Sequence, residues 1–169
     1  MKKYFFILVI MTLSFNAFAQ KKLLIYNFSS YDVNVNTILT KHTTNAYPNV
    51  SPLNTILIPS GGGSLELYTG HATRFPFNGL DSSSTLIIPT WVVQTSATIS
   101  STFPANAAAL TYGSNQVFHC IKYDDSLDSG ILGTGPLGTD TVVLTNTTGY
   151  YDEFLTGGII EYTLVIIDN

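Results

Sequence analysis

Three aspartates in one short segment are the residues best suited to bind a cation. Asp124, Asp125 and Asp128 fall within five consecutive positions. Calcium prefers several carboxylate and carbonyl oxygens, and carboxylates at positions 1, 2 and 5 of one loop can converge on an ion. The segment lacks the glycine and the distal glutamate of an EF-hand loop. It predicts either a Ca²⁺ site or, as the interpretation that we favour, a solvated acidic turn.

A second group combines aromatic rings with polar neighbours, which is the chemistry of sugar recognition. Tyr150, Tyr151 and Asp152 are consecutive, and Trp91 follows a proline and a threonine. Flat rings offer a stacking face, and hydroxyl and carboxylate groups add directional hydrogen bonds. Neighbouring strand residues point to opposite faces, so the two tyrosines cannot both face a core, and we expect an exposed pair. For Trp91 the alternative, which we favour, is a place in the core.

Signatures of catalytic sites are missing from the chain. The segment Gly-Gly-Ser-Leu-Glu at 62–66 fails the last position of a nucleophile elbow. His119 and Cys120 are adjacent, so on a strand they would point to opposite faces and not meet. As the lone cysteine, Cys120 is expected either to be buried or to pair with another chain. We therefore expect a protein that is not an enzyme and has no cofactor other than Ca²⁺.

The first residues have the pattern of a secretory signal. Residues 1–19 contain two lysines, a mostly apolar run and a small-x-small cleavage site at 17–19. This segment resembles the signals of secreted Bacteroidota proteins. We expect one domain in the mature chain of residues 20–169, exported to the periplasm, the cell surface or the medium.

Two tripeptides resemble an O-glycosylation motif of exported Bacteroidota proteins, in which Asp precedes Ser or Thr and an apolar residue follows. They are Asp-Ser-Leu at 125–127 and Asp-Thr-Val at 140–142. The resemblance implies Ser126 and Thr141 as modification sites.

Composition excludes several classes of protein. The chain of 169 residues is 45% hydrophobic and 11% charged, which is typical of a folded chain and not of a disordered one. Beyond residue 19, five basic side chains face eleven acidic ones, so the net charge of –6 argues against a nucleic-acid surface. One cysteine excludes an internal disulfide framework.

The charges are unevenly placed along the sequence. Residues 82–121 contain no Lys, Arg, Asp or Glu. Charge normally opposes association of soluble domains, so a long uncharged stretch tolerates contact with another surface. We expect this region to contact a protein partner, a second copy of the chain or a glycan.

Alternation of Val, Ile, Tyr, Phe and Thr predicts strands almost throughout. Eight segments have this pattern: 23–28, 32–39, 55–58, 64–68, 85–95, 116–123, 139–145 and 158–168. Only 105–110 is expected to be helical. Short strands separated by turns predict an all-β antiparallel sandwich, with jelly-roll and immunoglobulin-like topologies both open. An eight-stranded outer-membrane barrel is the alternative, although most segments are shorter than the ~9–11 residues that it needs.

These features favour a structural or interaction protein of the cell envelope, either self-assembling or part of a surface complex. The segment 23–28 would support assembly by strand addition if it lay at a sheet edge. A carbohydrate-binding module is the alternative function.

Overall fold

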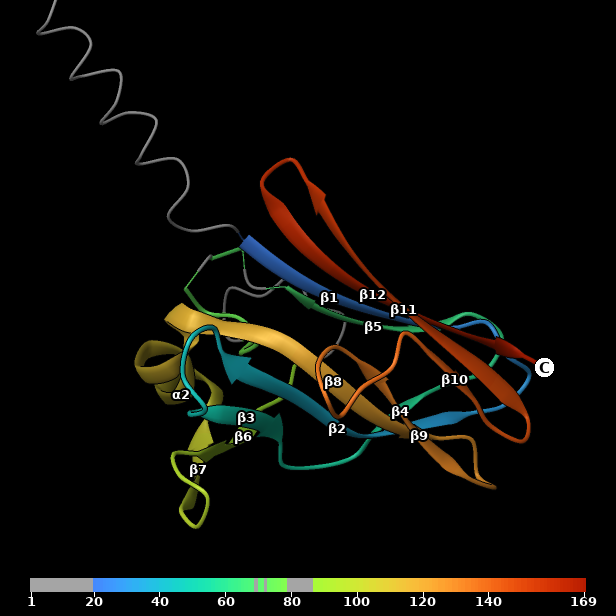
Figure 1. The fold of residues 1–169 in the computed structure, drawn as a ribbon, viewed down its shortest axis with the longest axis horizontal. Coiled ribbons are helices and arrows are strands. Elements are labelled where there is room, and N and C mark those ends of the chain that lie inside the picture. Colours follow the sequence, from blue (N-terminus) through green and yellow to red (C-terminus); the bar gives the residue numbers. More distant parts are fainter. Residues whose placement is uncertain (1–19, 69, 72, 79–86) are drawn as a thin grey trace, which may run out of the picture.

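The computed structural model describes residues 20–68, 70, 71, 73–78 and 87–169. The predicted signal and positions 82–86 of the uncharged region lie outside the described residues. The described chain is mostly β-structure, arranged in two sheets that share one core (Figure 1). The predicted all-β, largely antiparallel sandwich is confirmed.

Each sheet has a defined strand order. Sheet A has the order β10-β11-β12-β1-β5. Its strands are β1 (Gln20–Asn27), β5 (Gly63–Tyr68), β10 (Thr141–Val143), β11 (Thr147–Thr156) and β12 (Ile159–Asp168). Sheet B has the order β7-β6-β3-β2-β8-β9, and β4 also pairs with β2. Its strands are β2 (Val33–His42), β3 (Asn49–Pro52), β4 (Ile56–Ile58), β6 (Thr90–Gln94), β7 (Ser100–Pro104), β8 (Gln116–Asp124) and β9 (Ser129–Gly133).

A short helical connection joins β7 to β8. It consists of α2 (Ala105–Tyr112) and η1 (Gly113–Asn115), so the predicted helical turns at 105–110 are confirmed. α2 buries Ala105, Ala108 and Ala109. Within the part of the chain that the structure describes, no helix has the length and apolar character needed to cross a membrane.

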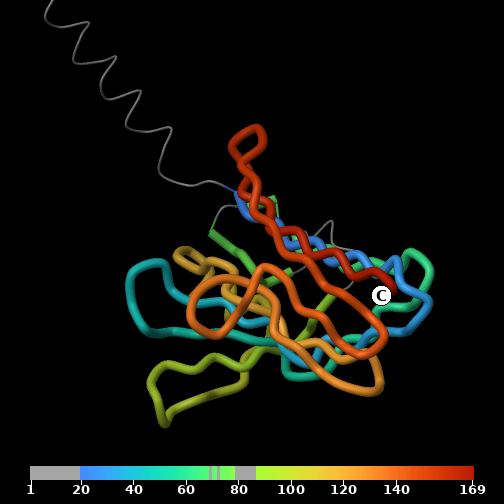
Figure 2. The backbone as a smooth tube through the Cα atoms, turned by 45° about the vertical axis from the view of Figure 1, so that its right-hand side comes forward, coloured from blue at the N-terminus to red at the C-terminus, as the bar shows by residue number. Residues whose placement is uncertain are grey.

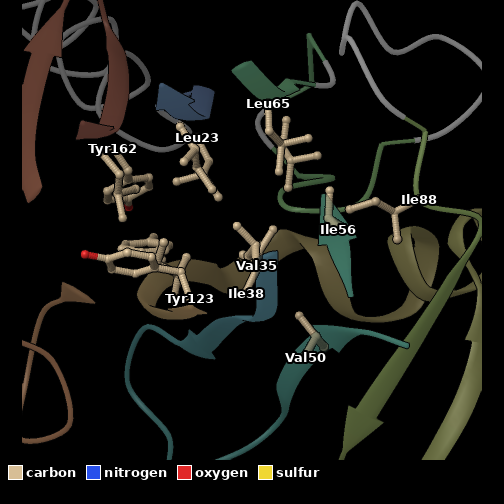
Figure 3. Close-up of a cluster of buried hydrophobic side chains, with 14 of the residues drawn as sticks. Leu23, Val35, Ile38, Val50, Ile56, Leu65, Ile88, Tyr123 and Tyr162 are labelled. Carbon is tan, nitrogen blue, oxygen red and sulfur yellow. The ribbon is translucent and has the colours of Figure 1, made fainter. Parts of the chain in front are cut away.

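The core lies between the sheets and follows the two-residue period of the strands. In β12, Tyr162, Leu164 and Ile166 are buried, whereas Thr163 and Val165 between them are only partly buried. This alternation is what places one side of each strand in the core. Figure 3 shows side chains from the two sheets pointing toward one another: Leu23, Leu65 and Tyr162 from sheet A, and Val35, Ile38 and Val50 from sheet B.

β1 is a central strand of sheet A and not an edge strand. It pairs in parallel with β12, from Gln20 opposite Ile159 to Asn27 opposite Ile166. On its other side it pairs antiparallel with β5, and Figure 1 shows it between these two strands. The backbone groups of β1 are therefore used within the molecule, and the sequence-based idea of assembly through residues 23–28 is wrong.

The side chain of Asn27, at the end of β1, connects the two sheets. It is fully buried, and its amide nitrogen donates to the carbonyl oxygens of Tyr31 at 2.8 Å and of Ile58 and Pro59 at 3.1 Å. Its Oδ1 accepts from the backbone N–H of Ser29 at 3.2 Å and from the Ser29 hydroxyl at 2.7 Å. Because Ile58 belongs to β4 in sheet B, one amide group holds this end of the sandwich together.

Asn27→Leu keeps the approximate volume of the side chain and removes its hydrogen-bonding groups. We expect the free energy of unfolding to fall by about 2–4 kcal/mol, because buried polar groups lose their partners. Urea unfolding followed by the fluorescence of the buried Trp91 measures this change. Asn106→Leu on the exposed side of α2 is the control, expected to change stability by less than about 0.5 kcal/mol. Equal losses in both variants would contradict the role of Asn27.

Candidate ligand-binding site

The two adjacent tyrosines of β11 lie on opposite faces of sheet A. Tyr150 is on the outer face and 44% exposed, whereas Tyr151 is only 9% exposed and belongs to the core. The ring of Tyr151 stacks on Phe118 of sheet B with their centroids 5.4 Å apart. The expectation of an exposed pair is therefore corrected, since Tyr150 alone presents its ring to solvent.

Trp91 is also part of the core and not of a surface site. It is fully buried in β6, with its indole N–H donating to the carbonyl oxygen of Ile88 at 3.1 Å. Its ring meets Phe77 edge to face at 5.1 Å. No face of this indole is open to a sugar, which corrects its assignment as a ligand-binding residue and supports the core alternative.

A shallow groove of about 380 Å³ surrounds Tyr150 on the outer face of sheet A. In the ladder Tyr150 lies opposite Thr141 of β10 on one side and Val165 of β12 on the other. Asp152 lies opposite Thr163 in the same way. The groove is lined by Asp140, Thr141, Tyr150, Tyr151, Asp152, Phe154, Thr163 and Val165.

Phe154 is a groove residue that was not predicted from the sequence. Its side chain is 46% exposed, and it continues the face of β11 that carries Tyr150 and Asp152. Residues i, i+2 and i+4 of a strand share one face, so the spacing of these three residues was the available signal. The groove thus offers two exposed rings.

The groove is acidic. Asp140 and Asp152 contribute carboxylates, and none of the eight lining residues is basic. The hydroxyl of Tyr151 donates to Glu153 at 3.2 Å, and burial, followed by the charge of Glu153, strongly raises the pKa of this phenol, which keeps it protonated. A ligand here meets two rings, threonine hydroxyls and negative charge, which favours neutral or cationic groups over anionic ones.

Both residues of the O-glycosylation motifs are exposed. Thr141 begins β10 inside the groove, and Ser126 lies in the turn after β8 with a backbone φ of 78°. Either hydroxyl is accessible to an enzyme, and modification of these residues stays a prediction.

Two of the three aspartates of the predicted calcium site accept hydrogen bonds from different parts of the molecule, Asp124 from β2 of sheet B and Asp128 from the β10–β11 turn of sheet A. Asp124 accepts from the side-chain amides of Asn34 at 3.1 Å and Asn36 at 2.6 Å. Asp128 accepts from the backbone N–H of Thr145 at 3.0 and 3.1 Å and from its hydroxyl at 3.1 Å. Among the described residues, no group of three or more His, Cys, Asp or Glu is arranged to hold a metal ion. Calcium binding stays a prediction, and these carboxylates have a structural use.

Asp125 is the buried member of this cluster and connects two turns. Its oxygens accept from the backbone N–H groups of Leu127 at 3.3 Å, Asp128 at 3.4 Å and Asn146 at 2.9 Å, and from the hydroxyl of Thr147 at 3.2 Å. Burial alone would raise the pKa of Asp125, but these donors outweigh it and hold the pKa below its ordinary value. The ionised carboxylate therefore holds the β8–β9 turn against the β10–β11 turn.

His119 and Cys120 lie at an irregularity of β8. The β2–β8 register shifts between Leu39–Cys120 and Thr40–Phe118, which leaves His119 as an extra residue. Side chains do not alternate strictly between the two faces at such a bulge, so His119 and Cys120 need not point to opposite faces as expected from the sequence. Cys120 is free and buried, as one of the two expectations had it. Burial raises the pKa of its thiol, which disfavours the thiolate that a nucleophile needs.

Comparison with protein families and curated proteins found no match to this chain. No protein-family model matches the chain, and no curated protein is significantly similar to it.

Asp125→Asn tests the connection between the two turns through its pH dependence. At neutral pH we expect the variant to be less stable than the wild type by about 2–3 kcal/mol, because hydrogen bonds to a charged acceptor are lost. The folded-state pKa is lowered, so the advantage of the wild type is full above about pH 4 and disappears as the pH falls below that value. Urea unfolding at pH 7 and pH 3 measures the difference, and a difference independent of pH would contradict this role.

Proposed function

We propose that this chain is an exported binding protein, not an enzyme, that recognises a carbohydrate in the groove around Tyr150. The observation that carries the proposal is the presence of two exposed rings, Tyr150 and Phe154, beside Asp152 and the threonines of β10 and β12 in one groove. The C–H face of a sugar stacks on a flat ring, while its hydroxyls donate to carboxylates. These are the two interactions that the groove provides.

The charge of the groove narrows the class of carbohydrate. Asp140 and Asp152 are not accompanied by a basic lining residue, so a uronic acid or sulfated sugar would bring like charges together. Neutral and amino sugars avoid this repulsion. A groove this open contacts one or two sugar rings, so we expect weak binding that depends strongly on the stacking face of Tyr150.

Tyr150→Ala removes the exposed ring and leaves the core intact. We expect at least a tenfold loss of affinity for a neutral oligosaccharide, which corresponds to about 1.4 kcal/mol. A glycan array identifies the sugar, and titration calorimetry measures the affinity. Tyr31→Ala is the control, because Tyr31 is 42% exposed, close to the 44% of Tyr150, and lies outside the groove. Absence of any bound glycan, or equal binding by both variants, would refute the proposal.

A further inference from the structure

Sheet B ends at β7, an edge strand without any charged residue. Among the described residues, four other strands, β4, β5, β9 and β10, have a side without a partner strand, and each is short, covered or charged. The outer side of β9 is bonded to Thr139, which accepts from the N–H of Gly133 at 3.0 Å and donates to the carbonyl of Ile131 at 3.4 Å. β4 and β10 have three residues each, β10 also follows Asp140, and β5 carries Glu66. Short length, covering segments and charges are the usual protections of an edge against pairing, and within the described parts of the chain β7 has no equivalent charge or cover.

The register of the β6–β7 hairpin determines which backbone groups of β7 face outward. The N–H of Thr95 donates to the carbonyl of Ile99 at 2.9 Å at the hairpin turn. At the other end the N–H of Ala105 donates to the carbonyl of Pro89 at 2.9 Å. Every second pair of an antiparallel ladder exchanges hydrogen bonds, so the pairs 93–101 and 91–103 between these ends are bonded.

The residues that alternate with these pairs direct their backbone away from β6. Ser100 and Thr102 therefore each present one N–H and one carbonyl at the free side of β7. Pro104 has no N–H and ends this row. The free edge thus offers the N–H and carbonyl groups of Ser100 and Thr102. These four groups can form a short ladder of backbone hydrogen bonds with one further strand.

The surroundings of this edge suit a second copy of the same chain. Residues 87–121 carry no charge, whereas the chain from residue 20 onward has a net charge of –6, so two copies repel each other least at this surface. The hairpin also carries Ile99, which is 59% exposed. Figures 1 and 2 show the β6–β7 hairpin projecting on the side opposite the β11–β12 hairpin.

We propose that two copies of the chain associate by antiparallel pairing of their β7 strands about a two-fold axis at Ser101. In this register Ser100 of one protomer lies opposite Thr102 of its partner, and the outward donors and acceptors match. Ser101 faces its own copy across the axis, where its small side chain permits the close approach of a non-hydrogen-bonded pair. The pairing occupies the free side of β7 in both protomers, so the contact forms a closed dimer and does not extend into a filament. The contact is small, so it is transient and depends on concentration.

Thr102→Lys tests the pairing directly. In this register position 102 lies diagonally across the axis from its own copy, so two lysines there introduce like charges on one face of the joined sheet. We therefore expect the association constant to fall at least tenfold in sedimentation equilibrium of residues 20–169, which contain both sheets. Thr102→Pro removes the outward donor without adding charge and should weaken association as well. Thr98→Lys adds the same charge in the hairpin turn and should leave association within twofold of the wild type. Raising the salt concentration should strengthen the wild-type dimer, since it screens the repulsion of two acidic protomers.

Ser101→Cys tests the position of the axis. The Cα atoms of a non-hydrogen-bonded pair lie about 4.5 Å apart, within the range that a disulfide spans. We expect this variant to form a covalent dimer under mild oxidation at concentrations where Thr98→Cys remains monomeric. The native Cys120 is buried and does not compete.

Three results would overturn the proposal: a wild-type monomer at the highest concentration reached, an association constant unchanged in both Thr102 variants, or equal cross-linking of the two cysteine variants. None of these results depends on a ligand in the groove. Failure of the dimer and failure of carbohydrate binding are therefore distinguishable.

Discussion

The parallel pairing of β1 with β12 is the constraint on which the rest of the structure depends. β1 brings Leu23 and Ile25 into the core and is the strand through which β5 joins sheet A. Asn27 at its end extends the connection to sheet B. The first described strand and the last one are neighbours, so the complete sheet A requires both ends of the described chain. Such distant contacts make folding slow and dependent on the complete chain.

Much of the fold class could be predicted from the sequence, but the strand order could not. The two-residue period is clear in β12, which buries every second residue from Tyr162 to Ile166, whereas the bulge in β8 leaves residues 118–121 buried in succession. β3, β7 and β9 were not among the predicted strands, because Pro48 precedes β3 and Pro52 ends it, and β7 and β9 are rich in serine or glycine. β7 and β9 each pair with the preceding strand in a hairpin, and β3 pairs with β2 and β6, so backbone pairing forms these strands although their sequence pattern is weak. The place of β1 between β12 and β5 depends on contacts distant in the sequence and has no local signal.

The groove shows the same division between local and distant information. Local alternation separates Tyr150 from Tyr151, but which of the two faces outward depends on the sheet that covers the other side. Trp91 follows a proline and a threonine in the sequence and has a ring partner, Phe77, fourteen positions away in the core. The aspartates 124, 125 and 128 were predicted from charge alone, whereas the use of Asp125 and Asp128 depends on the turn at 145–147 that meets them.

Dimerisation through the free edge of sheet B would change how the protein binds to a surface that carries repeated sugar units. Antiparallel pairing across an edge continues the sheet without turning it over, so both copies of sheet A would lie on the same side of the joined sheet. Their two grooves would then open in the same direction. On a polymer with repeated sugar units, the second groove would bind at a high effective concentration once the first is occupied. Weak individual sites would in this way produce long residence through avidity, and that residence would increase gradually with protein concentration as more dimer forms.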